Sequence, residues 1–85
     1  MMDWPTEVGK RLTSRRTELG LSRRKVADAV GLHHTTVVRI EKGAQALRLE
    51  QVVPYCKALN IDPVEFITVL IERDLSQRQT IKEKP

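Results

Sequence analysis

Residues 22–43 read SRRKVADAVGLHHTTVVRIEKG, and this stretch decides the fold of the chain. Its spacing predicts a helix over about 22–30, a sharp turn at Gly31 and a second helix over about 34–42. Ser22 is a favourable N-cap, and Gly31 can adopt the positive φ that a tight turn between helices requires. Apolar residues occur where the two helices must touch: Val26, Ala27, Val30, Leu32, Val37 and Ile40. The stretch therefore predicts two short helices packed against each other.

The outer face of the second helix carries His34, Thr35, Val38 and Arg39. Imidazole, hydroxyl and guanidinium groups can form hydrogen bonds with base edges, and a valine can pack against a thymine methyl group. Arg39 can donate to O6 and N7 of a guanine, and contact with a phosphate is the alternative for this residue. Such a helix pair is built to place its second helix in the major groove of DNA. We therefore expect these four residues to read bases.

Helical spacing of apolar residues predicts three further helices, so we expect an all-α, compact five-helix domain over residues 1–75. The first helix spans about 5–19, with Val8, Leu12 and Leu19 near one face. The sequence lacks the two signals of β-strands: apolar and polar residues do not alternate over any lasting stretch, and there is no Asn-Gly or Asp-Gly hairpin turn. The polar residues 76–85 are predicted to form a disordered tail.

The two helices that follow the pair carry one conflicting signal. The helix over about 49–59 is expected to bury Leu49, Val52, Val53, Cys56 and Leu59. Pro54 lies inside it, and because proline removes a backbone donor and clashes with the preceding turn, we expect a kink or a late start. The last helix spans about 63–75, because Asp62 followed by Pro63 is a strong start signal.

Basic residues cluster in the part of the chain that contains the helix pair. Residues 10–48 hold ten Lys or Arg against three acidic residues, a local charge of +7, whereas the whole chain carries +4. A basic block on a small domain indicates an anionic partner, with nucleic acid as the first candidate. A solvated basic face is the alternative.

Several other classes of protein lack support in the sequence. Cys56 is the single cysteine, so no internal disulfide can form; it fits a reducing cytoplasm and a place in the core. His33 and His34 are adjacent, with no cysteine or carboxylate at ligand spacing, so we expect no metal. The sequence contains no apolar run of ~20 residues for a membrane span and no catalytic constellation, and we expect no signal peptide, because no basic segment precedes an apolar run. We expect neither an enzyme, nor a cofactor, nor a small-molecule ligand.

Residues at fixed spacing between positions 8 and 67 carry a resemblance: Leu12, Arg16, Leu19, Gly20, Leu21, Ser22, Val26, Ala27, Val30, Gly31, Leu32, Val37, Ile40, Glu41, Gly43, Leu49, Ala58, Leu59, Asp62 and Pro63. This set resembles the lambda-repressor-like, Xre/Cro-type family of bacterial and phage DNA-binding proteins. The resemblance implies a homodimeric transcriptional regulator, a repressor or an autoregulator, on a palindromic operator. It also implies an ion pair between Arg16 and Glu41, with two independent surface charges as the alternative. A protein-interaction adaptor or an antitoxin-type component is the alternative function.

The chain departs from that family at the start of the first helix of the pair. Arg23, Arg24 and Lys25 stand where the family usually has Gln and Glu, so a capping box is missing and three cations oppose the helix dipole. A helix N-terminus that meets a phosphate would tolerate this charge, and drift at a solvated surface is the alternative. We expect phosphate contacts from Ser22, Arg23, Arg24, His33, Thr36 and Lys42.

The last predicted helix is apolar over more than half of its circumference. Its apolar residues are Val64, Phe66, Ile67, Val69, Leu70, Ile71 and Leu75. Packing against one core does not require so wide a face, so we expect a second copy to bury Phe66, Ile67, Leu70 and Ile71. The alternative is that Trp4 and the N-terminal segment fold over the same surface.

Overall fold

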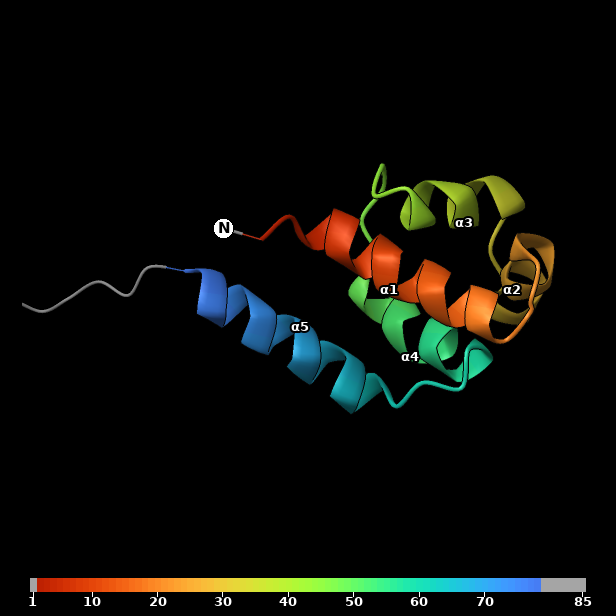
Figure 1. The fold of residues 1–85 in the computed structure, drawn as a ribbon. Coiled ribbons are helices and arrows are strands. Elements are labelled where there is room, and N and C mark those ends of the chain that lie inside the picture. The colour runs from red at the N-terminus through yellow and green to blue at the C-terminus, as the bar shows by residue number, and fades with distance from the viewer. Residues whose placement is uncertain (1, 79–85) are drawn as a thin grey trace, which may run out of the picture.

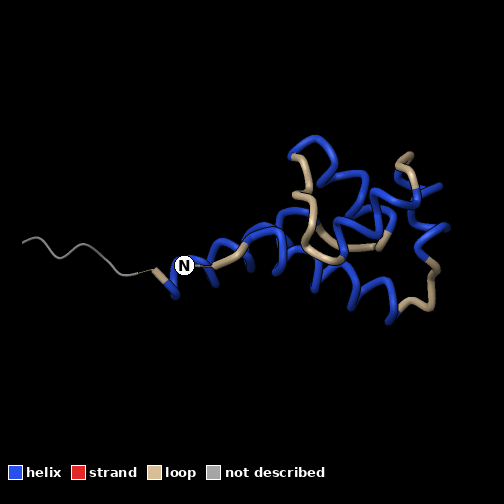
Figure 2. The backbone as a smooth tube through the Cα atoms, turned by 90° about the horizontal axis from the view of Figure 1, so that it is seen from above, coloured by secondary structure: helices blue, strands red, loops and turns tan. Residues whose placement is uncertain are grey.

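The computed structural model describes residues 2–78 of the chain, and these residues contain five α-helices. They are α1 (Trp4–Glu18), α2 (Arg23–Val30), α3 (His34–Glu41), α4 (Leu49–Ala58) and α5 (Pro63–Gln77). In Figure 1, α1 runs through the middle of the molecule, with α3 on one side and α4 and α5 on the other. Figure 2 shows from above that loops join the helices and that the described residues hold no strand. The predicted all-α, five-helix fold is confirmed.

The boundaries of α5 combine a predicted start with a later end. Asp62 is its N-cap, with a carboxylate oxygen that accepts the backbone N–H of Val64 at 2.9 Å, and Pro63 is the first residue of the helix. The helix continues to Gln77, two residues beyond the predicted end. The beginning of the predicted tail, residues 76–85, is therefore helical, and residues 79–85 lie outside the described residues.

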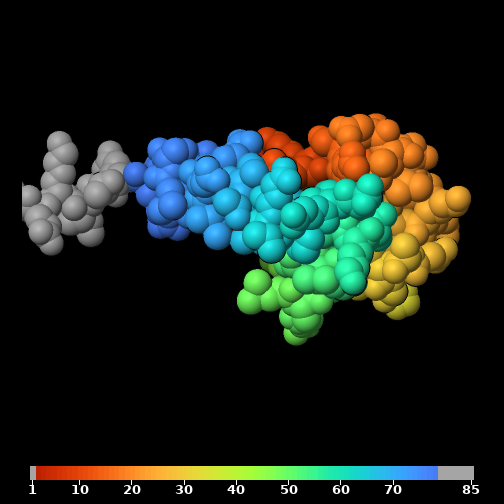
Figure 3. Space-filling model, turned by 90° about the horizontal axis from the view of Figure 1, so that it is seen from below, coloured from red at the N-terminus to blue at the C-terminus, as the bar shows by residue number. Residues whose placement is uncertain are grey.

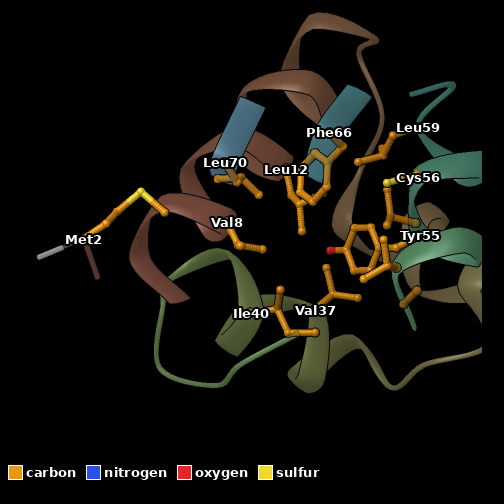
Figure 4. Close-up of a cluster of buried hydrophobic side chains, with 13 residues drawn as sticks. Met2, Val8, Leu12, Val37, Ile40, Tyr55, Cys56, Leu59, Phe66 and Leu70 are labelled. Carbon is orange, nitrogen blue, oxygen red and sulfur yellow. The ribbon is translucent and has the colours of Figure 1, made fainter. Parts of the chain in front are cut away.

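One core unites the N-terminal segment and all five helices (Figure 4). Its thirteen buried side chains are Met2, Val8, Leu12, Val26, Ala27, Val37, Ile40, Val52, Tyr55, Cys56, Leu59, Phe66 and Leu70. Cys56 is buried as predicted, and this burial raises the pKa of its thiol. Every helix therefore contributes at least one buried side chain to this core.

Two predicted core residues of α4 are exposed instead. Leu49 is 85% exposed and Val53 is 48% exposed. They are four residues apart and share a side of α4, which turns away from the buried Val52 and Cys56. The helix begins at Leu49, so Pro54 does not delay its start, and this proline lies on the exposed surface within the helix. The prediction assigned too wide a face of α4 to the core.

The N-terminal segment packs on the second half of α5. Met2 is buried and Trp4 is half-buried against the core. Both lie beside the buried carboxylate of Asp74, whose pKa is lowered by a hydrogen bond from Arg78 at 2.8 Å. The N-terminal segment therefore covers one side of α5, but Val64, Ile71 and Leu75 of the predicted apolar face remain exposed, so it does not cover the whole of that face as the alternative prediction held.

Candidate nucleic-acid interface

Helices α2 and α3 form a pair whose contact surface is fixed by buried side chains. Val26 and Ala27 on α2 and Val37 and Ile40 on α3 are at most 2% exposed. Gly31 follows α2 with a φ of 83°, and its N–H donates to the carbonyl of Ala27 at 2.8 Å. Glycine adopts this left-handed conformation at little cost. Because the inner side of α3 is locked in the core, its opposite side faces away from the molecule.

The four side chains predicted to read bases lie together on this outer side of α3. His34, Thr35 and Arg39 are exposed, and Val38 is half-buried on the same side. No ion pair among residues 2–78 involves Arg39. The face therefore presents a guanidinium, a hydroxyl, an imidazole and an apolar group, which are the groups that base edges in a major groove can engage.

The residues predicted to contact phosphates lie mostly at the starts of α2 and α3. Ser22 is the N-cap of α2, with a hydroxyl that accepts a backbone N–H of the first turn at 3.1 Å, and Arg24 is exposed beside it. His33 is the N-cap residue of α3, and its side chain makes no capping hydrogen bond. Thr36 is half-buried, and Lys42 is exposed directly after the helix. Because the first N–H groups of a helix have no intrahelical partner, both helix starts favour a nearby anion.

Glu41, the last residue of α3, joins the helix pair to α1. Its side chain is 1% exposed, and Arg16 on α1 donates to both of its oxygens, from Nε at 2.6 Å and from Nη2 at 3.1 Å. Arg16 also donates from Nη1 to the carbonyl of Leu21, before α2, at 2.9 Å. The ion pair that the resemblance implies is therefore present in the structure, and it contacts three segments at once.

Sequence reasoning missed a third member of this cluster. Arg23, the first residue of α2, donates from Nε to Oε1 of Glu41 at 2.8 Å. Burial raises the pKa of Glu41, but the hydrogen bonds and charges of Arg16 and Arg23 outweigh burial, so its pKa lies below the usual value. An arginine at the start of α2 is plain in the sequence, but its distance from a carboxylate on α3 depends on the fold.

Gly9 sets the distance between α1 and the end of α3. A Cβ atom at this position would lie 2.5 Å from the carbonyl oxygens of both Ile40 and Glu41. Such a contact is shorter than any that atoms tolerate, so the two backbones approach as closely as they do because the residue is glycine. Sequence reasoning missed this role. The available signal was a glycine inside an otherwise helical pattern.

Two of the four side chains predicted to meet a second copy lie in the core instead. Phe66 and Leu70 are 0% exposed, Ile67 is half-buried against the core, and Ile71 is 44% exposed. The prediction assigned the core-facing side of α5, that of Phe66 and Leu70, to the surplus that a second copy would cover. In the structure the rest of the protomer already covers one side of α5. On that side the guanidinium carbon of Arg11 lies 5.6 Å from the centre of the Phe66 ring.

A different set of apolar side chains on α5 remains exposed. Val64 is 72% exposed, Ile71 44% and Leu75 63%. Spacings of seven and four residues place them on one side of the helix, and we call these three residues the α5 stripe. Figure 3 shows α5, in blue and cyan, along the surface of the molecule. The stripe is therefore an apolar surface that the protomer does not cover with its described residues.

Other kinds of site find no support within residues 2–78. No group of three or more His, Cys, Asp or Glu side chains in this range could hold a metal ion. His33 and His34 are both exposed at the start of α3. None of the helices in the same range is both long and apolar enough to cross a membrane.

Comparison with known proteins finds the same fold. The Helix-turn-helix family profile matches residues 12–66. The restriction-modification controller protein C.AhdI from Aeromonas hydrophila is 32% identical, with a TM-score of 0.69, over 73% of this chain and 94% of that chain. The controller protein C.Esp1396I, solved as a tetramer in complex with its natural 35 base-pair operator, is 23% identical, with a TM-score of 0.73, over 88% of this chain and 99% of that chain. The clp gene regulator ClgR from C. glutamicum is 23% identical, with a TM-score of 0.72, over 91% and 96%. No curated protein sequence matches the chain.

Proposed function

The chain belongs to the lambda-repressor-like, Xre-type helix-turn-helix family of DNA-binding transcription regulators, and from this premise we propose that it binds a palindromic operator as a homodimer, with α3 in the major groove. One observation carries the proposal. The inner side of α3 is locked in the core, while its outer side presents base-competent side chains to solvent. The likeness to C.AhdI, a controller protein, supports a repressor or autoregulator. It acts on double-stranded DNA in the cytoplasm.

Base readout is assigned to the exposed face of α3. Arg39 donates to O6 and N7 of a guanine, and Val38 packs against a thymine methyl group. His34 and Thr35 contact the neighbouring base pairs from the first turn of the helix. A good bidentate contact discriminates against a wrong base by about 1–3 kcal/mol, so Arg39 supplies the largest share of specificity.

Phosphate contacts are assigned to the starts of α2 and α3 and to Lys42, directly after α3. Ser22, Arg23, Arg24, His33, Thr36 and Lys42 contribute hydroxyl, imidazole and cationic groups. Contacts to phosphates fix the register of the protein on DNA and release counterions. With about 6–10 phosphates neutralised per dimer, affinity falls roughly 10³–10⁵-fold between about 50 and 200 mM salt.

A second copy of the chain covers the α5 stripe in this proposal. Removing its three exposed apolar side chains from water would favour association, because each Å² of apolar surface that a copy buries contributes about 25 cal/mol. We expect a two-fold axis through α5 to place the two α3 helices about 34 Å apart, a spacing that matches half-sites about 10–10.5 bp apart. C.Esp1396I, which has the same fold, is a tetramer on its operator, and this supports binding as an oligomer.

Selection of bound duplexes from a random DNA pool tests the proposal. We expect enrichment of a palindrome whose half-site centres are about 10–10.5 bp apart. A pool that remains random after several rounds would reject the regulator and favour a protein-interaction adaptor with the same fold.

Two variants sharpen the selection. Thr35→Ala alters the proposed reading face and should change the preferred base at one position of each half-site. Lys57→Ala removes a positive charge from α4, on the other side of α1 (Figure 1), and should leave the selected sequence unchanged. An altered sequence with Lys57→Ala, or an unaltered one with Thr35→Ala, would move the reading face away from α3.

A further inference from the structure

Arg23 makes a contact that its proposed phosphate role does not require. It is the first residue of α2, and its Nε donates to Oε1 of Glu41, the last residue of α3, at 2.8 Å. Arg16 already donates to both oxygens of the same carboxylate. The second arginine is therefore not needed to pair the Glu41 charge, and it adds a link between the start of α2 and the end of α3.

The geometry of the Arg23 side chain leaves a second function open. Its side chain is 38% exposed, against 15% for Arg16, and its two Nη groups make no hydrogen bond with any described residue. A guanidinium is planar and rigid, so a bond from Nε fixes the direction of both Nη groups. An Arg23 held by Glu41 thus presents two oriented donors at the start of α2, where the helix N-terminus also favours an anion.

We propose that Arg23 is a positioning residue for DNA readout, which holds the end of α3 in register with the phosphate that its own Nη groups contact. The inference rests on the proposed function and adds to it a coupling between backbone contact and base contact. Because one rigid group bonds both Glu41 and the phosphate, the reading face is tied to the DNA backbone through Arg23. The choice of bases then depends on a residue that touches none of them.

The ratio of two dissociation constants distinguishes a positioning role of Arg23 from that of a simple phosphate ligand. One Kd is measured on the selected operator and the other on a random-sequence duplex of equal length, each at several salt concentrations. A simple phosphate ligand weakens both complexes by the same factor and reduces the salt slope by about one per protomer. We expect this result for the matched control Arg24→Ala, since Arg24 is exposed and pairs with no described carboxylate.

Arg23→Lys carries the decisive measurement. Lysine keeps the positive charge, so the salt slope should stay at its original value. Its single ammonium group cannot bond Glu41 and a phosphate in the fixed geometry of the guanidinium fork. The Kd on the random duplex divided by the Kd on the operator should therefore fall roughly 3- to 30-fold. A ratio equal to that of the original protein in Arg23→Lys would overturn the inference.

Acid unfolding tests the link without DNA. The charged or titratable groups that face Glu41 are Arg16 from α1, Arg23 from α2 and Tyr55 from α4. Removing Arg23 raises the pKa of Glu41, so Arg23→Ala should unfold at a higher pH than the original protein on acidification, whereas Arg24→Ala should not. An unchanged acid midpoint in Arg23→Ala would overturn the link itself. If the original protein selected no DNA sequence, the proposed function would be wrong. The role of Arg23 in readout would then be wrong as well, whatever the acid midpoint.

Discussion

At the scale of single residues, an absent Cβ atom matters as much as any side chain. Gly9 lets α1 approach the last turn of α3, and the carbonyls of Ile40 and Glu41 occupy the space that a Cβ would need. Since α3 carries the proposed reading face, a glycine on α1 sets where that face stands. No backbone flexibility is involved, because Gly9 lies inside a regular helix and buried.

Gly9→Ala should therefore destabilise the fold. Both neighbouring carbonyls belong to backbone and cannot swing aside, so the helices must move apart at a cost of about 1–3 kcal/mol. The free energy of unfolding in urea measures this loss. Ser14→Ala, at an exposed position of the same helix, provides the control and should change the value by less than about 0.5 kcal/mol. A Gly9→Ala protein as stable as the control would show that α1 and α3 are not in backbone contact in solution.

Arg39→Ala tests the proposed reading face at one side chain. Loss of a bidentate contact should cost about 1–3 kcal/mol on the selected operator and relax the preference at one base pair of each half-site. Affinity for random DNA should change far less. The measurement is the Kd for the operator and for each of its single-base variants. Equal weakening on operator and random DNA would make Arg39 a phosphate ligand.

At the scale of helices, the Glu41 cluster shows which interactions the sequence could predict. The Arg16–Glu41 pair was predicted through a resemblance, whereas the bond from Arg23 to Glu41 was not. Helix starts were predictable because their signals act within a few residues, as Ser22 and Asp62 demonstrate. A contact across 18 residues depends on how the helices pack, and no local pattern encodes it.

The sides that helices turn toward the core were predicted less well, for a related reason. A 3.6-residue period indicates that a helix has an apolar face, but a helix with two apolar sides leaves open which one the protomer buries. On α5 the buried side is that of Phe66 and Leu70, and the exposed side is that of Ile71. On α4, the prediction assigned Leu49 to the core, but in the structure Val52 and Cys56 are buried and Leu49 is exposed. Which side is buried depends on the helices that pack against it, and the sequence of one helix does not specify that packing.

Arg16→Ala should remove most of the support that Glu41 receives. A buried carboxylate that loses its main partner costs roughly 3–5 kcal/mol, which is a large part of the stability of a domain this small. Arg23 still offers one bond, so we expect the lower end of this range. Urea unfolding measures the loss, with Lys10→Ala as the control, because Lys10 is exposed on the same helix. An unshifted midpoint would contradict the ion pair.

The same cluster sets a dependence of stability on pH. The pKa of Glu41 in the folded state lies below its usual value of 4.5, so the stabilisation by its carboxylate is complete above that value and is lost as the pH falls through the folded pKa. Urea midpoints measured from about pH 7 down to about pH 3 should therefore decrease on the acidic side. Glu41→Gln should be less stable at neutral pH and should lose less on acidification. An identical pH profile in both proteins would show that Glu41 is not the group that titrates.

At the scale of the whole molecule, α5 has two roles: it completes the core, and it carries the surface proposed to contact a second copy. α5 closes the core through Phe66 and Leu70, and it presents the α5 stripe on another side. The N-terminal segment covers the helix near Asp74 but leaves Leu75, one residue further, 63% exposed. A substitution in the stripe can therefore act on assembly without opening the core, which a substitution at Leu70 could not do.

Leu75→Glu uses this separation. A carboxylate placed in an apolar contact between two copies should cost at least about 2 kcal/mol, which raises the Kd of the dimer at least roughly 30-fold. Ser76→Glu adds the same charge one residue along, on a different side of α5, and should leave the dimer intact. The mass in solution and the binding to full and half operators provide the readout. We expect Leu75→Glu to be monomeric, folded and restricted to weak binding of single half-sites, because one α3 helix then acts without its partner. A Leu75→Glu protein that remains dimeric and binds the full palindrome normally would place the interface elsewhere, with the exposed Leu49 and Val53 of α4 as the next surface to substitute.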